Sequence, residues 1–363
     1  MNVLIILVVL SAVYGVAGWM TAHWGLKGLT CSRSFSRSTA FEGESGEMIE
    51  VVRNDRPLMI PWLRVESQIS PHLQLGRQEN LNVSGSRYYR SLFTLMPYQQ
   101  VKRRHKVRFL HRGVYDLGSA SLTVGDALGW FQQGREQHMH VPVMVYPRLL
   151  DERELPEPLS LKLGEMISRR QLLADPFQVR GIRAYVPGDP VRDIHWAASA
   201  RMGETQVRVF DHTAQANLLV LLNVERTNAQ RGEKLMEYEE SEIEYGIAMA
   251  ATLCVRALRA GMQAGFGANM PLDKGQTSTL LLPGSSAQRE EELLATFARL
   301  TILRTVSFPV FLASLKDIEN MDILVLTCYE NEAIQKELAN LRRRGNQVTL
   351  HLLNQGKAGG GAA

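Results

Sequence analysis

The sequence predicts an α/β domain with a mostly parallel sheet and helices on both faces, preceded by an antiparallel β-sandwich-like domain and an N-terminal transmembrane helix. Three observations predict this fold class. The chain starts with an uncharged apolar stretch, continues with short alternating runs up to about residue 146, and ends with continuous apolar runs that alternate with helical patterns. At 363 residues it is long enough for two domains.

These patterns divide the chain into five segments. We expect a transmembrane anchor at 1–26, a β-rich domain at 27–150, a linker at 151–160, an α/β domain at 161–355 that carries a dense motif at 181–209, and a flexible tail at 356–363.

The first 26 residues contain no Lys, Arg, Asp or Glu. Val3 to Trp24 consists mainly of Ile, Leu, Val, Ala and Gly, and a helix over this stretch is about 33 Å long, which matches a hydrocarbon core of ~30 Å. A cleaved signal peptide is the competing interpretation, but the basic segment and the small-residue cleavage site that it needs are both missing. We therefore expect a single-pass cell-membrane protein whose residues 3–24 lie in the lipid bilayer.

Flanking charge predicts the orientation of this anchor. Lys27, Arg33 and Arg37 follow the apolar stretch, and no charged side chain precedes it. Because positive charges favour the cytoplasmic side of a span, we expect the C-terminal domains to lie in the cytoplasm.

Charge and cysteine content argue against two kinds of site. The net charge is only +4 and is spread thinly, without the aromatic-interleaved or finger-type patterns of nucleic-acid-binding proteins, so we expect no nucleic-acid partner. The three cysteines, Cys31, Cys254 and Cys328, share no C-x-x-C spacing, and they predict neither a disulfide framework nor a zinc site.

Short alternating runs between Leu29 and about Tyr146 indicate antiparallel strands. The clearest are Met48 to Arg53, Leu63 to Ile69, Tyr88 to Leu95, His105 to Leu110, and Ser121 to Val124. Asp151 to Pro158 then carries five charged residues and two prolines, which cannot continue a strand ladder and therefore predict a linker.

Beyond the linker, continuous apolar runs replace the alternating ones. Asn217 to Val224 and Met321 to Thr327 are apolar almost throughout, as parallel strands buried on both faces require. Between them lies a helical pattern from Ile243 to Leu258, and Asn331 to Arg344 forms another before a last strand. This alternation predicts a parallel sheet covered by helices.

The motif at 181–209 concentrates arginines, aspartates and aromatic residues around a turn that Pro187 and Pro190 enforce. In a catalytic interpretation, Asp189, Asp193 and His195 supply a carboxylate and a base, and the protein is a hydrolase acting on envelope material. Against it, the chain contains no G-x-S-x-G, no Walker loop and no H-E-x-x-H motif.

Two other interpretations of the motif remain open. In a structural one, paired Asp and Arg side chains hold the turn while Trp196 inserts as an anchor between domains. In the third, the motif is a docking face for a partner, because Trp, Tyr and Arg are the residue types that most often carry interface energy.

The motif resembles the signature R-x-Y-x-x-G-D-x-x-R-x-I-x-W-x-x-S-A-R of the bacterial family known as domain of unknown function 58. The matching residues are Arg183, Tyr185, Gly188, Asp189, Arg192, Ile194, Trp196, Ser199, Ala200 and Arg201. The resemblance extends over nearly the whole chain, through an N-terminal apolar segment and the stretches "FEGE" (Phe41 to Glu44), "HRGVYDLG" (His111 to Gly118) and "GDALGWF" (Gly125 to Phe131).

The resemblance implies that the C-terminal domain is like a von Willebrand factor type A domain. Such domains commonly hold a divalent cation through Asp-x-Ser-x-Ser after the first strand. Here Asn223, Glu225 and Thr227 take those positions, Arg226 lies among them, and the later strand ends in Thr327 instead of an Asp. We therefore expect a degenerate metal site and no cofactor beyond weak binding of Mg²⁺.

The resemblance also implies a partnership with a MoxR-type AAA ATPase in the assembly or maturation of other proteins. Because the chain lacks catalytic motifs, we expect a non-enzymatic, membrane-anchored adaptor or scaffold that uses the type A-like domain to bind the ATPase and client proteins. The alternatives are the envelope hydrolase described above and a metal-dependent adhesion module, which requires an intact cation site and the opposite topology.

Overall fold

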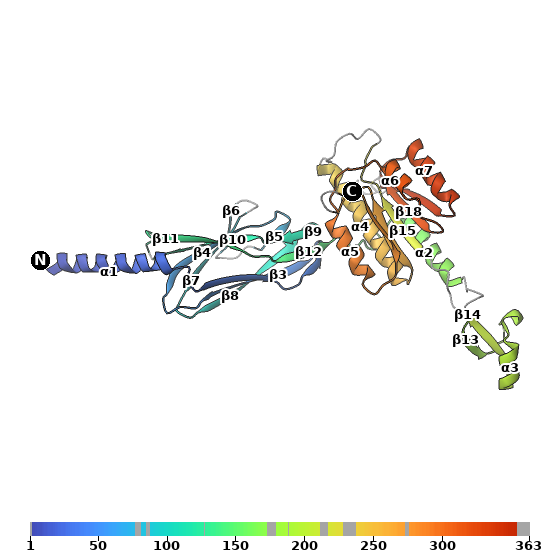
Figure 1. The fold of residues 1–363 in the computed structure, drawn as a ribbon, viewed down its shortest axis with the longest axis horizontal. Helices are drawn as coiled ribbons and strands as arrows, with labels where there is room; N and C mark the ends of the chain where they lie inside the picture. The colour runs from blue at the N-terminus through green and yellow to red at the C-terminus, as the bar shows by residue number, and fades with distance from the viewer. Residues whose placement is uncertain are drawn as a thin grey trace, which may run out of the picture. The chain divides into compact units, whose positions relative to one another are not determined.

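The structure is a computed structural model that describes residues 2–76, 81–84, 88–126, 128–172, 179–187, 189–210, 217–227, 237–272 and 276–353. It divides into two compact units, Met1–Arg148 and Leu149–Ala363. Figure 1 shows the elements of both units, which are described separately below.

The first unit begins with helix α1 (Asn2–Trp24). Its stretch Val3–Met20 has a mean hydropathy of 2.4, and it is the single candidate for a membrane span among the described residues. By length and composition this helix is apolar enough to cross a bilayer, as the sequence predicted. The cytoplasmic location of the C-terminal domains stays a prediction.

The rest of the first unit consists of mainly antiparallel strands in three sheets with a β-sandwich-like character (Figure 1). The sheets have the orders β1-β3-β8-β5, β11-β10-β4-β7-β6 and β2-β12-β9, and the β2–β12 pair is parallel. The strands are β1 (Leu29–Phe35), β2 (Thr39–Phe41), β3 (Ser45–Asn54), β4 (Ile60–Gln68), β5 (Leu73–Leu75), β6 (Leu81–Ser84), β7 (Tyr88–Leu95), β8 (Gln100–Phe109), β9 (Gly113–Asp116), β10 (Ser119–Gly125), β11 (Gln132–His138) and β12 (Pro142–Tyr146).

Alternation along these strands builds the core of the first unit. Successive side chains point to opposite faces of a sheet, so every second residue of a half-buried strand is apolar. Leu63 and Val65 of β4 and Leu122 of β10 are fully buried in one apolar cluster, and Met48 of β3 and Val107 of β8 are buried in another.

The second unit contains a five-stranded mixed sheet with the order β17-β16-β15-β18-β19. All neighbours are parallel except β17, which pairs antiparallel with β16 at the edge. The elements are β15 (Asn217–Leu222), β16 (Gln263–Ala268), β17 (Thr279–Gly284), β18 (Asp322–Thr327), β19 (Gln347–Leu352), α2 (Glu157–Leu172), α4 (Glu237–Arg259), α5 (Arg289–Arg299), α6 (Phe308–Ser314) and α7 (Glu332–Arg343). Helix α2 begins inside the segment that we expected to be a linker.

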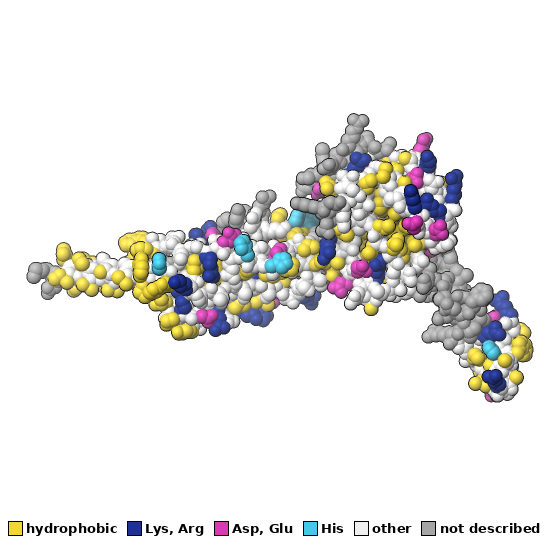
Figure 2. All heavy atoms as spheres, in the orientation of Figure 1, with side chains coloured by type: hydrophobic (Ala, Val, Ile, Leu, Met, Phe, Trp, Pro, Cys, Tyr) yellow, Lys and Arg dark blue, Asp and Glu magenta, His cyan; other side chains and the backbone are white. Residues whose placement is uncertain are grey.

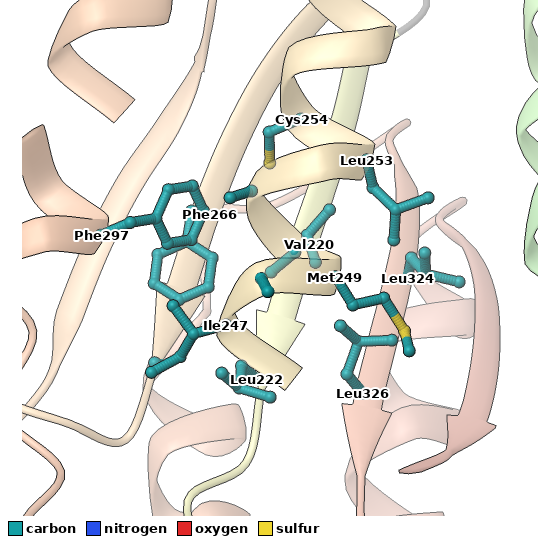
Figure 3. Close-up of a cluster of buried hydrophobic side chains, with 14 of the residues drawn as sticks. Val220, Leu222, Ile247, Met249, Leu253, Cys254, Phe266, Phe297, Leu324 and Leu326 are labelled. Atoms are coloured by element: carbon teal, nitrogen blue, oxygen red, sulfur yellow. The ribbon is translucent and has the colours of Figure 1, made fainter. Parts of the chain in front are cut away.

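Strand β15 is apolar from Leu218 to Leu222 because it contributes to two cores. Val220 and Leu222 pack with α4 in one cluster, whereas Leu219 and Leu221 pack with residues of α6 and α7 in another. Figure 3 shows the first cluster, in which the Phe266 ring of β16 lies against Phe297 of α5, with ring centroids 4.4 Å apart. Burial on both faces therefore accounts for the continuous apolar run.

The motif segment folds into a small hairpin of its own. Strands β13 (Val179–Ala184) and β14 (Gln206–Phe210) pair antiparallel, and the chain between them forms a short 3-10 turn (Val191–Asp193) and helix α3 (Trp196–Met202). We call residues 179–210, without the undescribed Gly188, the motif hairpin.

The predicted α/β fold class of von Willebrand factor type A kind is wrong for this chain. Antiparallel strands in several sheets dominate the described residues, helices are few, and the structure shows one mixed sheet. The apolar runs at β15 and β18 do form neighbouring parallel strands, but such runs report burial on both faces and not the size or order of a sheet. The motif segment, which the prediction included in the α/β domain, is an antiparallel hairpin instead.

Candidate functional site: the motif hairpin

The turn of the motif hairpin is held by the carboxylate of Asp189. Both of its oxygens accept hydrogen bonds at 2.7 Å from the two terminal nitrogens of Arg183, and Oδ2 also accepts the Val186 N–H at 2.9 Å. The hydrogen bonds from Arg183 and then from Val186 hold the pKa of Asp189 below its usual range. The bidentate pair therefore stays charged and fixes the turn geometry. Gly188, a further signature residue, lies outside the described residues.

His195 and Ser199 attach helix α3 to strand β14. The Nδ1 atom of His195 caps the helix by accepting the Ala198 N–H at 3.1 Å, while the backbone N–H of His195 donates to the Gln206 carbonyl at 2.8 Å. The Ser199 hydroxyl accepts the Gln206 N–H at 2.8 Å and donates to the His195 carbonyl at 3.0 Å. The signature residue Ser199 and its neighbour His195 thus use their polar groups within the hairpin.

A small buried centre supports these contacts. Ile194 forms an isolated β-bridge with Val207, and both side chains are buried. Gly203 closes α3 in the left-handed conformation, with a φ of 74°, which a residue without Cβ adopts at no steric cost.

Most other large apolar side chains of the hairpin are exposed. Trp196 is 68% exposed, so the hairpin itself does not bury its ring. Figure 2 shows hydrophobic side chains at the surface of the hairpin. We call this set the apolar face; its members are Ile182, Tyr185, Val186, Val191, Trp196 and Met202.

Arginines accompany the apolar face. The signature residues Arg192 and Arg201 are exposed, and the side chain of Arg192 lies 3.7 Å from the Asp193 carboxylate. A surface that exposes Arg together with Trp and Tyr has the composition that protein–protein interfaces favour.

The residues of the catalytic interpretation have separate partners among the described residues. Asp189 binds Arg183, Asp193 lies next to Arg192, and His195 caps α3. A general base needs the proton of a substrate or nucleophile within hydrogen-bond reach, whereas these three side chains contact groups of the hairpin itself. Among the described residues, the hydrolase interpretation therefore has no support.

The positions of the expected degenerate cation site lie at the ends of β15 and β18. The Asn223 amide donates to Thr327 Oγ1 at 3.0 Å, and its Oδ1 accepts the Glu225 N–H at 2.9 Å. Glu225 is buried, and its carboxylate binds Arg304 at 2.5 Å and the Tyr329 hydroxyl at 2.8 Å. Partial burial and the bond to the carboxylate raise the pKa of this hydroxyl.

An arginine therefore supplies the positive charge at Glu225 that a cation supplies in an intact site. Arg226 turns to α4 instead, where it binds Glu242 at 2.7 Å, and Thr227 is exposed. Within the described ranges, no group of three or more His, Cys, Asp or Glu residues is placed to hold a metal ion. The donor set at this place does not fit a divalent cation, which prefers several free oxygen ligands.

The sequence reasoning missed a buried polar cluster in the first unit, formed by Arg33, Glu50, Tyr89 and His105. The Arg33 guanidinium binds Glu50 at 2.6 Å and also the hydroxyl of Ser67, and Tyr89 OH lies 3.0 Å from Glu50 and 2.8 Å from His105. All four side chains are buried. Arg33 is thus paired inside the protein and contributes little to the flanking charge that predicted membrane orientation.

The motif hairpin also identifies the relatives of this chain. Residues 181–298 match the family described as protein of unknown function DUF58. The predicted resemblance is confirmed over these residues, which run from the motif hairpin through β15, α4, β16 and β17 into α5. A type A fold and an ATPase partner are not part of the DUF58 match.

No curated protein matches the chain. Among solved structures, partial similarity is found to native alpha-2-macroglobulin from Escherichia coli (10% identity, TM-score 0.27, 33% of this chain and 23% of that chain) and to the bacterial hydrophobin BslA (10%, 0.23, 34% and 98%). The CARDB domain of the PF1109 protein from Pyrococcus furiosus is a third example (13%, 0.21, 33% and 96%). This chain spans about a quarter of the length of that alpha-2-macroglobulin structure. At these TM-scores the similarity carries no conclusion about fold or function.

Proposed function

We propose that this DUF58 protein is a membrane-anchored, non-enzymatic adaptor that docks a protein partner through the apolar face of its motif hairpin. The observation that carries the proposal is the exposure of Trp196 and five further large apolar side chains on a hairpin whose turn is held by a bidentate ion pair. Exposed aromatic side chains on a rigid support lose little conformational entropy on binding.

The proposed partner is a MoxR-type AAA ATPase, together with the client proteins on which it acts. The support for this choice is the DUF58 match, since the family resemblance implies such an ATPase. The exposed Arg192 and Arg201 beside the apolar face suit a partner surface that is apolar at its centre and acidic at its rim.

We further propose that α1 tethers the adaptor to the cell membrane, with the C-terminal domains in the cytoplasm. The length and hydropathy of α1 support the tether. Lys27 and Arg37 support the orientation, because both follow the helix and neither is buried. Tethering confines the ATPase and its clients to the membrane surface.

Binding of the full-length protein in lipid nanodiscs to the cognate MoxR-type ATPase tests this proposal. The Trp196→Ala variant is expected to lose at least tenfold in affinity, equivalent to about 1.4 kcal/mol, because a central aromatic residue carries much of an interface's energy. Leu161→Ala is the matched control, since Leu161 is a similarly exposed apolar residue on α2.

Stability measurements separate docking from a structural role. Because Trp196 is mostly exposed, its truncation is expected to change the free energy of unfolding by less than about 0.5 kcal/mol. Failure of the unmodified protein to bind the ATPase, with or without ATP, would contradict the choice of partner. Equal affinity of the two variants would contradict the assignment of the apolar face.

A further inference from the structure

The loop between β10 and β11 packs directly against helix α1. Asp126 accepts a hydrogen bond from the Tyr14 hydroxyl, which in turn accepts the Leu128 N–H at 3.1 Å. The Tyr14 ring meets Trp130 edge-on, with ring centroids 5.8 Å apart. Phe131 N–H donates to Asp126 at 2.7 Å. We call Asp126 and residues 128–131 the helix-side loop; residue 127 lies outside the described residues.

One turn further along α1, Gly18 allows a close approach of the same loop. A Cβ atom at Gly18 would lie 2.6 Å from Cδ2 of Phe131, whereas one at Gly15 would meet nothing within 4 Å. The helix therefore has one face, through Tyr14 and Gly18, that is already packed against the β domain before the helix ends at Trp24.

This packing leaves too little free helix to cross a bilayer. The twelve or so residues of α1 that precede Tyr14 span roughly 18 Å at 1.5 Å per residue, while the hydrocarbon core is ~30 Å thick. If α1 crosses the membrane, Tyr14 lies inside the hydrocarbon core. The loop that contacts Tyr14 then lies there too.

The surface of the helix-side loop suits that position. Trp130 is 75% exposed and Leu128 is 62% exposed, although both belong to a tight connection between two strands. The one charged side chain of the loop, Asp126, is buried and receives several hydrogen bonds, as a polar group near hydrocarbon requires.

Two neighbouring loops present further apolar side chains at the same end of the β domain. The connections β3–β4 and β7–β8 are joined by hydrogen bonds from Asn54 to the Leu58 and Met96 carbonyls and from Tyr98 N–H to the Arg56 carbonyl. Arg56 also binds backbone carbonyls of Trp24 and Gly25 where α1 ends. Their exposed members are Leu58, Met59, Met96 and Tyr98, and Figure 2 shows hydrophobic side chains gathered where α1 meets the β domain.

We propose that this end of the β domain is a membrane-inserted wedge, in which Leu128 and Trp130 reach the acyl chains of the bilayer that α1 crosses. The occupant of the surface is lipid, because the patch is continuous with the apolar helix that the loops contact. The inference rests on the proposed membrane tether. Under this proposal the β domain is itself partly immersed in the bilayer and is not connected to it through a flexible linker.

A depth measurement on the full chain in lipid vesicles tests the wedge. A polarity-sensitive fluorophore is attached to Leu128→Cys or, in a second variant, to Trp130→Cys. Native cysteines do not compete, because Cys31, Cys254 and Cys328 are buried and burial raises their pKa values to about 11, about 12 and about 11. The control label is at Val191→Cys, an exposed position of the motif hairpin.

Lipids that carry a quencher on the acyl chain are expected to lower the emission at 128 and 130 at least twofold and to leave the label at 191 unchanged. Retention in the vesicles after an alkaline wash is measured on the same samples. Protein that is retained but unquenched at both loop positions overturns the wedge and leaves the tether in place. Protein that is washed off overturns both.

Discussion

Two arginine–carboxylate ion pairs, one in each unit of the molecule, have similar N–O distances but different structural roles. Arg33–Glu50 in the first unit is 2.6 Å long with both side chains fully buried. Arg183–Asp189 in the motif hairpin is 2.7 Å long, with side chains 48% and 16% exposed. A short distance is therefore no measure of what an ion pair contributes.

The surroundings explain the difference. Moving two charges out of water costs several kcal/mol, and Glu50 offsets this only because Arg33 and Tyr89 donate to it while His105 lies 3.6 Å away. Solvent screens the exposed pair, whose benefit lies in holding a turn and not in global stability. The buried pair specifies one packing of the sandwich, and the exposed pair specifies the shape of a surface.

The largest expected effect follows from breaking the buried pair. Glu50→Gln leaves the Arg33 charge buried without a counter-charge, and we expect a loss of about 3 to 5 kcal/mol in the free energy of unfolding, measured by chemical denaturation. Glu47→Gln is the matched control, because Glu47 lies on the same strand β3 in an exposed pair with Arg104. Equal losses in the two variants would refute the comparison.

Acid is expected to weaken the same pair. Burial by itself raises the pKa of Glu50, but the polar contact with His105, the hydrogen bonds from Arg33 and Tyr89 and the charge of Arg33 outweigh it and lower the pKa from 4.5 to about 2. A depressed carboxylate pKa gives stability that is complete above the unfolded value and is lost as the pH falls towards the folded value. The stability difference between the unmodified protein and Glu50→Gln should therefore shrink between about pH 4.5 and pH 2. A difference independent of pH over that range would be inconsistent with a charged Glu50.

A smaller, local effect is expected in the motif hairpin. Ser199→Ala removes the acceptor of the Gln206 N–H and the donor to the His195 carbonyl. The loss of about 1 kcal/mol should accelerate exchange of the Gln206 amide hydrogen about fivefold and leave amides of β15 unaffected. Unchanged exchange at Gln206 would show that the hydroxyl does not hold α3 on β14.

The smallest effect on global stability is expected from Asp189→Asn. The exposed pair with Arg183 is screened by solvent, so the unfolding midpoint should not move. Loss of the carboxylate frees the turn, and the affinity for the proposed ATPase partner should fall. Asp55→Asn, which breaks the exposed Arg53–Asp55 pair, serves as a control that should affect neither property. A shifted midpoint for Asp189→Asn would mean that the hairpin is coupled to the core.

Periodicity predicted individual elements better than it predicted their assembly. The apolar runs of β15 and β18 and the helical pattern of α4 lie where the sequence placed them, because each reports burial along its own length. The order of the sheet, the antiparallel edge β17 and the separate β13–β14 hairpin depend on contacts between distant segments. The prediction of a type A-like fold was wrong because it required these contacts between distant segments.

The same limit applies to the candidate site. The signature residues were found through the resemblance to domain of unknown function 58, and the same resemblance implied a missing carboxylate at Asn223. The sequence did not predict which of these side chains are buried or what they contact. The charge of Arg33 predicts membrane orientation if the side chain is free, yet Arg33 is buried against Glu50, 17 positions along the chain. Composition alone cannot predict such a pair, because the sequence does not distinguish an arginine that faces water from one that faces a carboxylate.

The sequence by itself determined the apolar helix α1, the strands with alternating side chains and the DUF58 signature, since all three are local properties of the chain. Only the tertiary structure decided which signature residues are buried and which are exposed, that Arg304 lies at Glu225, and that α1 is packed against the loop at Asp126 well before its end. Each of these depends on residues far apart in sequence meeting in space, where burial and electrostatics then set their roles.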